Sequence, residues 1–287
     1  MTGRTDFASG KGHRDENFPV ASFLVRSELR APILAFYRFA RAADDVADHA
    51  SASAEEKLAQ LALLEAGVRG DIAGDPRALA LRTVLDERGL TIEHALDLLV
   101  AFRRDVTQQR YASWAELMDY CRYSAAPVGR FVLDVHAEAS TLWPANDALC
   151  AALQVINHLQ DCAKDYRALD RVYVPLDALA ARELGVESLR ERRASPALRD
   201  VIAGLAERTS ALLEQSRRFA SQITDRRLAT EVGVIQSLAE SLAGRLKRFD
   251  PLSERVHHRP VEMIGLALRG GLGVWAHRLT GLGGTPT

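Results

Sequence analysis

The fold is organised around one stretch that carries two acids on one helical face, Phe36-Tyr37-Arg38-Phe39-Ala40-Arg41-Ala42-Ala43-Asp44-Asp45-Val46-Ala47-Asp48. Its apolar residues recur at helical spacing, so we predict a helix. Residues four apart then lie one turn apart on the same face, which brings the carboxylates of Asp44 and Asp48 within about 6 Å along the axis. Tyr37 and Arg41 precede them on that face. Two carboxylates so close repel each other unless a cation lies between them.

A second stretch far downstream repeats this chemistry, Gln154-Val155-Ile156-Asn157-His158-Leu159-Gln160-Asp161-Cys162-Ala163-Lys164-Asp165. Asp161 and Asp165 are again four residues apart, and Gln154 and Asn157 precede them at helical spacing. The polar positions alternate with apolar residues here as well. Both stretches therefore predict a polar face on an otherwise apolar helix.

Two acidic faces of this kind predict a magnesium site. An unpaired charge buried in a helical bundle costs several kcal/mol, so such faces need a bound partner. Carboxylate oxygens suit Mg²⁺, which completes its shell with water and substrate phosphates. We therefore expect Mg²⁺ together with a phosphate or diphosphate ligand. Solvated surface acids are the simpler interpretation of one Asp-x-x-x-Asp pair, but the second copy and its companions favour the site.

Two further motifs connect the acidic stretches to a known family. Tyr120-Cys121-Arg122-Tyr123-Ser124-Ala125-Ala126-Pro127-Val128-Gly129-Arg130 lies between them, and Arg171-Val172-Tyr173-Val174-Pro175 follows them. In this order, over residues 37 to 175, the motifs resemble those of the squalene/phytoene synthase family of head-to-head prenyl synthases. The runs 16–22, 39–45 and 122–130 are most similar to its bacterial hydroxysqualene synthase branch, which acts in hopanoid biosynthesis.

The resemblance implies a fold, a reaction and a cofactor. The fold would be an all-α, single-domain helical bundle of the isoprenoid synthase type with a central active-site cavity. The reaction would convert presqualene diphosphate and water to hydroxysqualene and diphosphate, with Mg²⁺ as cofactor. Phe36, Phe39 and Phe131 are candidates for lining a dry tunnel, although plain core packing is the simpler interpretation of each.

The resemblance also assigns roles to individual residues. The expected catalytic residues are Tyr120, Asp44, Asp48, Asp161 and Asp165. The expected metal ligands are these four aspartates and Asn157, with Asp45 assisting from its neighbouring position. The expected substrate-binding residues are Ser22, Tyr37, Arg41, Gln154, Asn157, Arg171 and Tyr173. We assign no ligand role to His49 or His158, because a lone histidine beside such a face is more often a packing residue.

Two other functions stay open. One is a condensing enzyme that makes presqualene diphosphate or phytoene from two prenyl diphosphates. The other is a non-catalytic relative that uses the bundle as an assembly or lipid-binding factor. The second alternative is disfavoured by the four aspartates together with Arg41, Asn157 and Arg171, because a relative that has lost catalysis has no need of a metal cluster.

Composition narrows the class of protein. Of 287 residues 47% are hydrophobic and 26% charged, which is typical of a soluble globular protein. The net charge of −1 disfavours nucleic acid as a partner. Three cysteines, an odd number without metal-type spacing, indicate a reducing cytoplasm. Residues 1–15 read as a flexible arm without signal-peptide character, and 16–287 as one domain. The apolar run 261–275 predicts core packing or, alternatively, peripheral contact at the inner membrane surface.

Start and stop signals predict helices along the whole chain. Capping boxes are expected at Ser53-x-x-Glu56 and Ser113-x-x-Glu116. Pro127 and Gly129 are expected to kink or break the helix that follows the second box. Six expected helices have both bounds predicted: 22–30, 92–110, 117–136, 147–166, 196–222 and 224–247. Four more are predicted from their starts: one opened by Pro32, one from Ser53 towards Gly70, one from Pro76 and a last one from Pro260.

Overall fold

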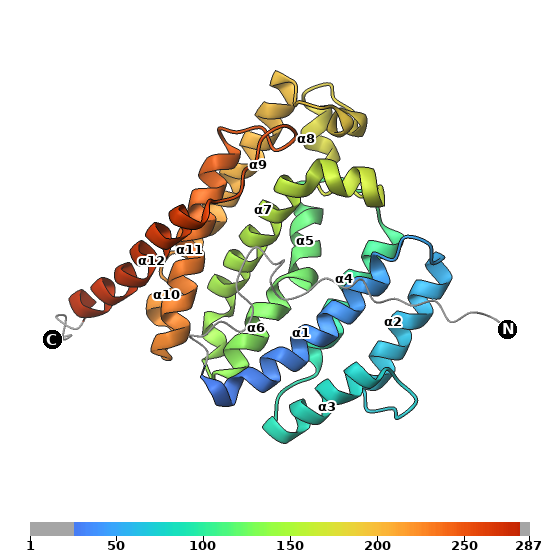
Figure 1. The fold of residues 1–287 in the computed structure, drawn as a ribbon, viewed down its shortest axis with the longest axis vertical. Coiled ribbons are helices and arrows are strands. Elements are labelled where there is room, and N and C mark those ends of the chain that lie inside the picture. The colour runs from blue at the N-terminus through green and yellow to red at the C-terminus, as the bar shows by residue number, and fades with distance from the viewer. Residues whose placement is uncertain (1–25, 282–287) are drawn as a thin grey trace. The chain divides into compact units, whose positions relative to one another are not determined.

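The computed structural model describes residues 26–281, with side chains for 26–259 and 261–275 (Figure 1). Over this range it contains helices and no strand, apart from one isolated bridge between Arg110 and Val172. The prediction of an all-α fold is confirmed. The predicted arm 1–15 and the predicted substrate-binding residue Ser22 lie outside the described residues.

The helices follow one another with short connections. Their bounds are α1 Ser27–Ala47, α2 Ala54–Val68, α3 Pro76–Arg88, α4 Glu93–Thr107, α5 Trp114–Ser124, α6 Ala126–Val135, η1 Ser140–Leu142, α7 Trp143–Leu169, α8 Leu176–Ala180, η2 Val186–Arg190, α9 Pro196–Gln215, α10 Phe219–Gln222, α11 Arg226–Leu246 and α12 Pro260–Gly281. Over the described residues they form two compact units: 26–109 with 119–137, and 110–118 with 138–281. One domain over residues 16–287 stays a prediction.

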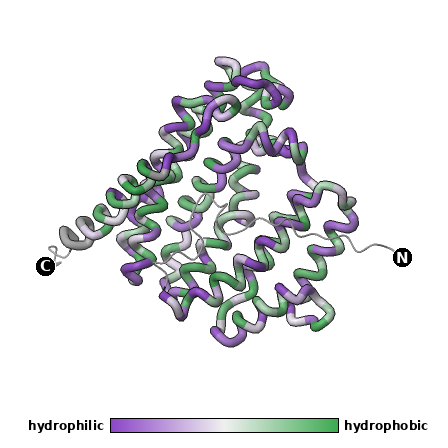
Figure 2. The backbone as a smooth tube through the Cα atoms, viewed as in Figure 1, coloured by the Kyte–Doolittle hydropathy of each residue, from purple (hydrophilic) through white to green (hydrophobic). Residues whose placement is uncertain are grey.

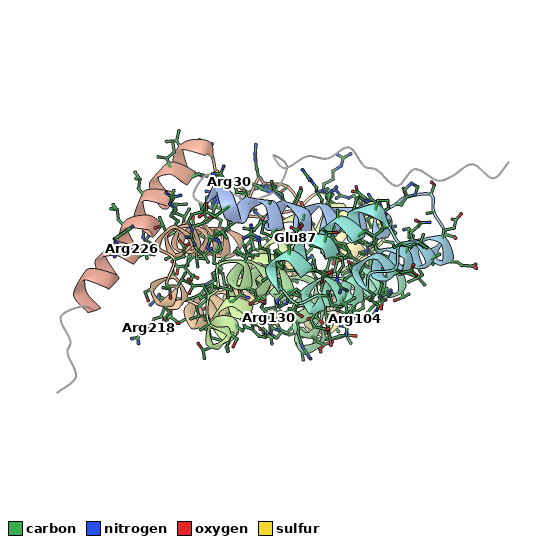
Figure 3. All side chains as sticks on the ribbon, turned by 90° about the horizontal axis from the view of Figure 1, so that it is seen from below. Arg30, Glu87, Arg104, Arg130, Arg218 and Arg226 are labelled. Carbon is green, nitrogen blue, oxygen red and sulfur yellow. The ribbon has the colours of Figure 1, made fainter. Side chains whose placement is uncertain are left out.

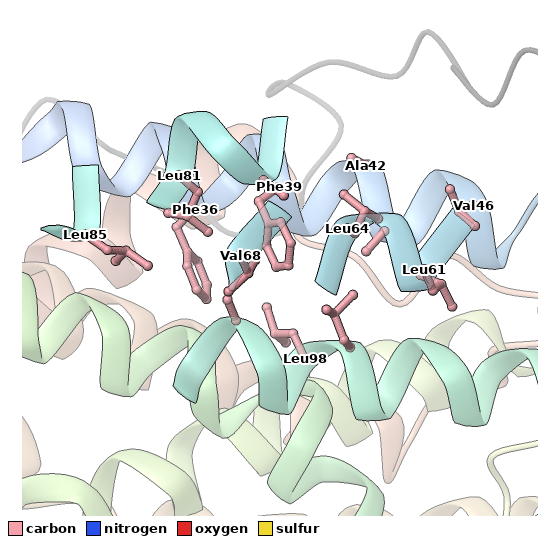
Figure 4. Packing of buried hydrophobic residues seen from close by; sticks show 14 of the residues in the cluster. Phe36, Phe39, Ala42, Val46, Leu61, Leu64, Val68, Leu81, Leu85 and Leu98 are labelled. Atoms are coloured by element: carbon pink, nitrogen blue, oxygen red, sulfur yellow. The ribbon is translucent and has the colours of Figure 1, made fainter. Parts of the chain in front are cut away.

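In the first unit, α1 packs against α2, α3, α4 and α6. Phe36 and Phe39 of α1 are buried with Leu61, Leu64 and Leu98 of the neighbouring helices (Figure 4). Phe36 also stacks on Phe131 of α6, with ring centroids 4.1 Å apart. The phenylalanines expected to line a tunnel thus belong to this packed core. Because the apolar face of α1 is used for packing, its acidic residues lie on another face.

Pro32 lies inside α1, where the sequence predicts a boundary between two helices. The prediction of separate helices at 22–30 and from Pro32 is wrong in this respect. Proline has no N–H, so it cannot donate the helical hydrogen bond to the carbonyl of Glu28. Arg88 Nη2 donates to that carbonyl at 2.8 Å instead. An arginine from α3 thereby compensates for the missing donor.

One of the two predicted capping boxes forms completely and the other forms in part. Ser53 and Glu56 form a complete capping box at α2. At the second predicted box, Glu116 N–H donates to Ser113 Oγ, while the Glu116 carboxylate accepts from Ala112 N–H. α11 begins at Arg226, two residues later than predicted, and its capping side chain is Asp225, which accepts from two backbone N–H groups.

Three predicted helices end early or divide. The helix 92–110 ends at Thr107. The helix 196–222 ends at Gln215, and α10 forms separately. The helix 117–136 divides into α5 and α6 at Ala125, where φ is −122° and ψ is −48°. The break precedes Pro127, whose missing N–H is tolerated in the first turn of α6.

In the second unit, α7 packs against α9 and α11, and α11 packs against α9 and α12. Hydrophobic and hydrophilic residues alternate along most helices, as Figure 2 shows by colour. The buried faces consist mainly of alanine, leucine, valine and isoleucine. Within the described residues, no helix is both long enough and apolar enough to cross a membrane.

Candidate active site

The first acidic half of the candidate site is the C-terminal end of α1. Asp44 lies in the last turn, and Asp48 is the C-cap residue, whose N–H donates to the Asp44 carbonyl. Arg41 Nη1 lies 2.6 Å from Asp44 Oδ2, and Arg41 Nη2 lies 3.0 Å from Asp45 Oδ1. Tyr37 is half-buried and lies one turn before Arg41. The structure thus brings the predicted residues of α1 together, with Asp45 sharing the arginine.

Several acidic side chains lie close together at this end of α1 and shift the pKa of Asp44. The pKa of Asp44 is raised to about 7, mainly by burial and secondly by the nearby Asp48 carboxylate. Arg41 opposes this shift, whereas Asp45 and Asp105 add to it. The Asp44 side chain therefore changes its charge near neutral pH, and a bound cation would favour its ionised form.

Tyr120 contacts a buried acid that the sequence analysis missed. Its phenol donates to Asp105 of α4, with both carboxylate oxygens 3.0 Å away. Tyr120 and Asp105 are both buried. Because the phenol hydrogen points to Asp105, the lone pairs of the phenol oxygen remain to accept. The signal for Asp105 was its spacing, since it follows Leu98 and Ala101 on the buried face of α4.

The second acidic half of the candidate site lies on α7. Gln154, Asn157, Asp161 and Asp165 are each half-buried on this helix, as the sequence predicts. Lys164 Nζ lies 3.4 Å from Asp161 Oδ2, but this lysine is exposed, so the pair is weak. The four predicted residues of α7 share one polar face.

The stretch after α7 is buried and held by ring stacking. Tyr173 stacks on His158 with ring centroids 3.6 Å apart and on Tyr111 with centroids 5.5 Å apart. Arg171 is buried, and its backbone N–H donates to the Asp165 carbonyl. Burial, together with the Arg171 charge, lowers the pKa of His158 to about 3. His158 is thus a neutral residue that packs against Tyr173.

The chemistry of the donor set fits Mg²⁺ in each half. Two carboxylates one turn apart supply hard oxygen ligands. In the α1 pair the pKa of Asp44 is raised, first by burial and then by the Asp48 carboxylate, and a bound cation would oppose both effects. Among residues 26–281, the structure draws no three or more His, Cys, Asp or Glu side chains into one ligand cluster. Joint coordination by both aspartate pairs stays a prediction.

The cysteines lie outside this chemistry. Cys121 and Cys162 are buried and Cys150 is half-buried, all as thiols. Burial raises the pKa of Cys162 to about 12, so the thiol stays protonated at neutral pH. Cys121 and Cys162 are therefore small packing residues of the core.

Comparison with known proteins places this arrangement in a family. The model of the squalene/phytoene synthase family matches residues 12–262. The chain belongs to the squalene/phytoene synthase family. It is 56% identical to the hydroxysqualene synthase of Zymomonas mobilis subsp. mobilis, covering 90% of this chain and 88% of that protein. The hydroxysqualene synthase of Rhodopseudomonas palustris is 54% identical, covering 92% of this chain and 90% of that protein.

Solved structures support the same family. The squalene synthase HpnC from Alicyclobacillus acidocaldarius has a TM-score of 0.70 and 34% identity, covering 80% of this chain and 87% of its own. A dehydrosqualene synthase has a TM-score of 0.75 at 21% identity, covering 91% and 92%, and shows the shared fold. The predicted family and isoprenoid synthase fold are confirmed.

Proposed function

We propose that this squalene/phytoene synthase family member is a hydroxysqualene synthase, which converts presqualene diphosphate and water to hydroxysqualene and diphosphate. Its high identity to hydroxysqualene synthases over nine-tenths of the chain carries this proposal. The two aspartate pairs support it, because they supply oxygen ligands for a metal-bound diphosphate. A cytoplasmic location with peripheral membrane contact stays a prediction.

Ionisation of the substrate is the step that needs catalysis. When bound, Mg²⁺ would neutralise the charge that develops on the leaving diphosphate, and its proposed ligands are Asp44, Asp48, Asn157, Asp161 and Asp165. The guanidinium groups of Arg41 and Arg171 would donate to non-bridging oxygens. Arg41 now contacts Asp44 and Asp45, so it would exchange part of this pairing for diphosphate when the aspartates bind metal.

Four further residues are proposed to contact the substrate. Tyr37 would extend the diphosphate-binding face of α1, and Gln154 that of α7. Tyr173 would hold its position through the stack on His158. A role for Ser22 rests on the family resemblance alone.

The reaction balances without a redox cofactor. The carbon–oxygen bond to diphosphate breaks, and diphosphate leaves with the electron pair. The cyclopropylcarbinyl cation rearranges, a water oxygen forms the new carbon–oxygen bond, and the surplus proton of that water passes to a base. Tyr120 would present the lone pairs of its oxygen to the cation or to the attacking water, because Asp105 accepts its hydrogen.

Presqualene diphosphate and Mg²⁺ with the purified protein test this proposal. We expect a C30 alcohol, ¹⁸O from labelled water in its hydroxyl group, and no effect of NADPH. Squalene formed only with NADPH would contradict water capture. Consumption of farnesyl diphosphate with presqualene diphosphate or phytoene as end product would identify a condensing enzyme instead. Binding of the substrate without turnover would favour the non-catalytic alternative.

Metal dependence needs its own measurement. We expect chelation of Mg²⁺ to abolish turnover, and isothermal titration to show that diphosphate binds tightly only when Mg²⁺ is present. An Asp161→Asn variant with undiminished turnover, or activity that survives chelation, would contradict the proposed metal site.

A further inference from the structure

Helix α12 presents a continuous apolar stripe to its surroundings. Val261, Ile264, Leu268, Leu272 and Trp275 retain 80%, 63%, 60%, 68% and 41% of their surface exposed. Steps of three and four residues place these five side chains on one face of the helix. Large apolar residues exposed singly are ordinary, but a contiguous row marks an interaction surface. We call these five residues the α12 stripe.

The stripe is not what attaches α12 to the rest of its unit. A different face packs on α11, where Val274 is buried and Gly270 approaches Gly233 closely. A Cβ atom on Gly270 would lie 2.3 Å from the Gly233 carbonyl oxygen, so the two backbones are in direct contact. The helix is therefore anchored through its glycine face, and the stripe is available for another purpose.

Charges near the stripe are mainly basic. Glu262 is the one acidic residue in the α12 sequence, and Arg245 lies 3.5 Å from its carboxylate. Arg226 lies over the Trp275 ring at 5.7 Å, beside α12 in Figure 3. Arg218 and Arg227 are also exposed, on the neighbouring α10–α11 segment, and α10 packs against both α11 and α12. Arg226 thus lies beside the C-terminal end of the stripe, and two further exposed arginines lie on the adjoining α10–α11 segment.

We propose that the α12 stripe inserts into the interface of an anionic lipid bilayer. A helix with one apolar face, a tryptophan and flanking arginines is suited to lie in the headgroup region, with its apolar side chains among the acyl chains. Each arginine near the surface adds attraction to anionic headgroups. The inference concerns only α12 and its neighbours and does not rest on the proposed reaction.

A second copy of the chain fits this surface less well. A stable dimer buries about 1,200 Å² or more, whereas the stripe is one row of side chains on one helix. Arginines near the stripe would gain less from a second copy of the same basic surface than from anionic headgroups. The basic flank therefore favours lipid over self-association.

Vesicle co-sedimentation of the full chain tests the proposal. We expect binding to vesicles that contain phosphatidylglycerol, weaker binding to pure phosphatidylcholine, and a loss of binding at high salt because the arginine attraction is screened. Leu268→Glu with Leu272→Glu should weaken binding at least about tenfold, since each leucine loses favourable apolar burial. The matched control is Ile72→Glu, at an exposed apolar residue of the α2–α3 connection, which should bind like the unchanged protein.

Trp275 supplies an independent readout. Its fluorescence should shift to the blue with anionic vesicles, and Trp275→Phe should remove this shift while the other two tryptophans, Trp114 and Trp143, remain. Circular dichroism should show all variants folded, because the substituted side chains are exposed. Equal binding of the glutamate variant and the control would overturn the proposal. Self-association of the unchanged protein that the glutamate variant loses, without any vesicle binding, would overturn it in favour of a second copy.

Discussion

Tyr120 donates its phenol hydrogen to the buried carboxylate of Asp105, with both carboxylate oxygens 3.0 Å away. The two residues lie fifteen positions apart, on α5 and α4. This contact connects a predicted catalytic residue to an acid that also raises the pKa of Asp44. It therefore joins two parts of the candidate site within the first unit.

Tyr120→Phe should impair product formation more than it impairs folding. The ring and its packing remain, while the hydroxyl group and its hydrogen bond to Asp105 are lost. We expect reduced turnover or a changed product distribution, with a stability loss of about 1–2 kcal/mol because a buried acceptor loses one donor. Product analysis and thermal unfolding measure the two effects. Normal products with a large stability loss would show that the hydroxyl group is purely structural.

Asp105→Asn should lower the pKa of Asp44, because it removes a nearby negative charge that disfavours ionisation. Carboxyl-carbon NMR titration of the protein without ligand measures that pKa directly. The matched control is Asp119→Asn, since Asp119 is an exposed acid paired with Arg104 in the same unit. An Asp44 pKa that stays the same in both variants would show that Asp105 does not act on Asp44.

Asp44→Asn should stabilise the protein without ligand at pH 8 and lose this effect towards pH 4. The pKa of Asp44 is about 7 when folded against 3.8 ordinarily. Between pH 3.8 and about 7 the folded state therefore binds more protons than the unfolded state. The free energy of unfolding thus falls as pH rises through this window. Because the side chain is partly solvated, we expect a gain on the order of 1 kcal/mol. Thermal unfolding at both pH values measures it, and turnover should nearly vanish. A variant less stable than the unchanged protein at pH 8 would contradict the expected repulsion.

His158→Gln should make the protein less sensitive to acid. The pKa of His158 is about 3 when folded against 6.5 ordinarily. Protons therefore bind the unfolded state first, and stability is lost as pH falls from about 6.5 to about 3, by at most about 1.4 kcal/mol per pH unit. Urea unfolding across this range should give a flatter profile for the variant than for His257→Gln. Parallel profiles for the two variants would mean that His158 takes up a proton while folded.

Gly270→Ala should destabilise the packing of α12 on α11. The new Cβ would lie 2.3 Å from the Gly233 carbonyl oxygen, and relief of this overlap costs typically about 1–3 kcal/mol. Gly265→Ala is the matched control, because nothing lies within 4 Å of its Cβ position, and alanine favours a helix by about 0.5–1 kcal/mol. Thermal unfolding should thus separate the two substitutions in opposite directions. Equal stability of the two variants would show that the helices separate at little cost.

The amino-acid sequence by itself determined the helical class, the two aspartate faces and the family. Helical spacing is local, so Asp44 with Asp48 and Asp161 with Asp165 could be assigned to common faces before any fold was known. The cap at Ser53 could be predicted in the same way, because a cap bonds to the backbone only a few residues away.

Only the tertiary structure decided features that depend on distant partners. Pro32 is tolerated inside α1 because Arg88, far along the chain, donates to the Glu28 carbonyl. The sequence does not show what Asp105 contacts, because its partner, the Tyr120 hydroxyl group, is brought to it only by folding. The same holds for α12, whose apolar run is ambiguous in sequence. Which of its faces is buried depends on the close approach of Gly270 to Gly233, and local spacing carries no information about such a contact.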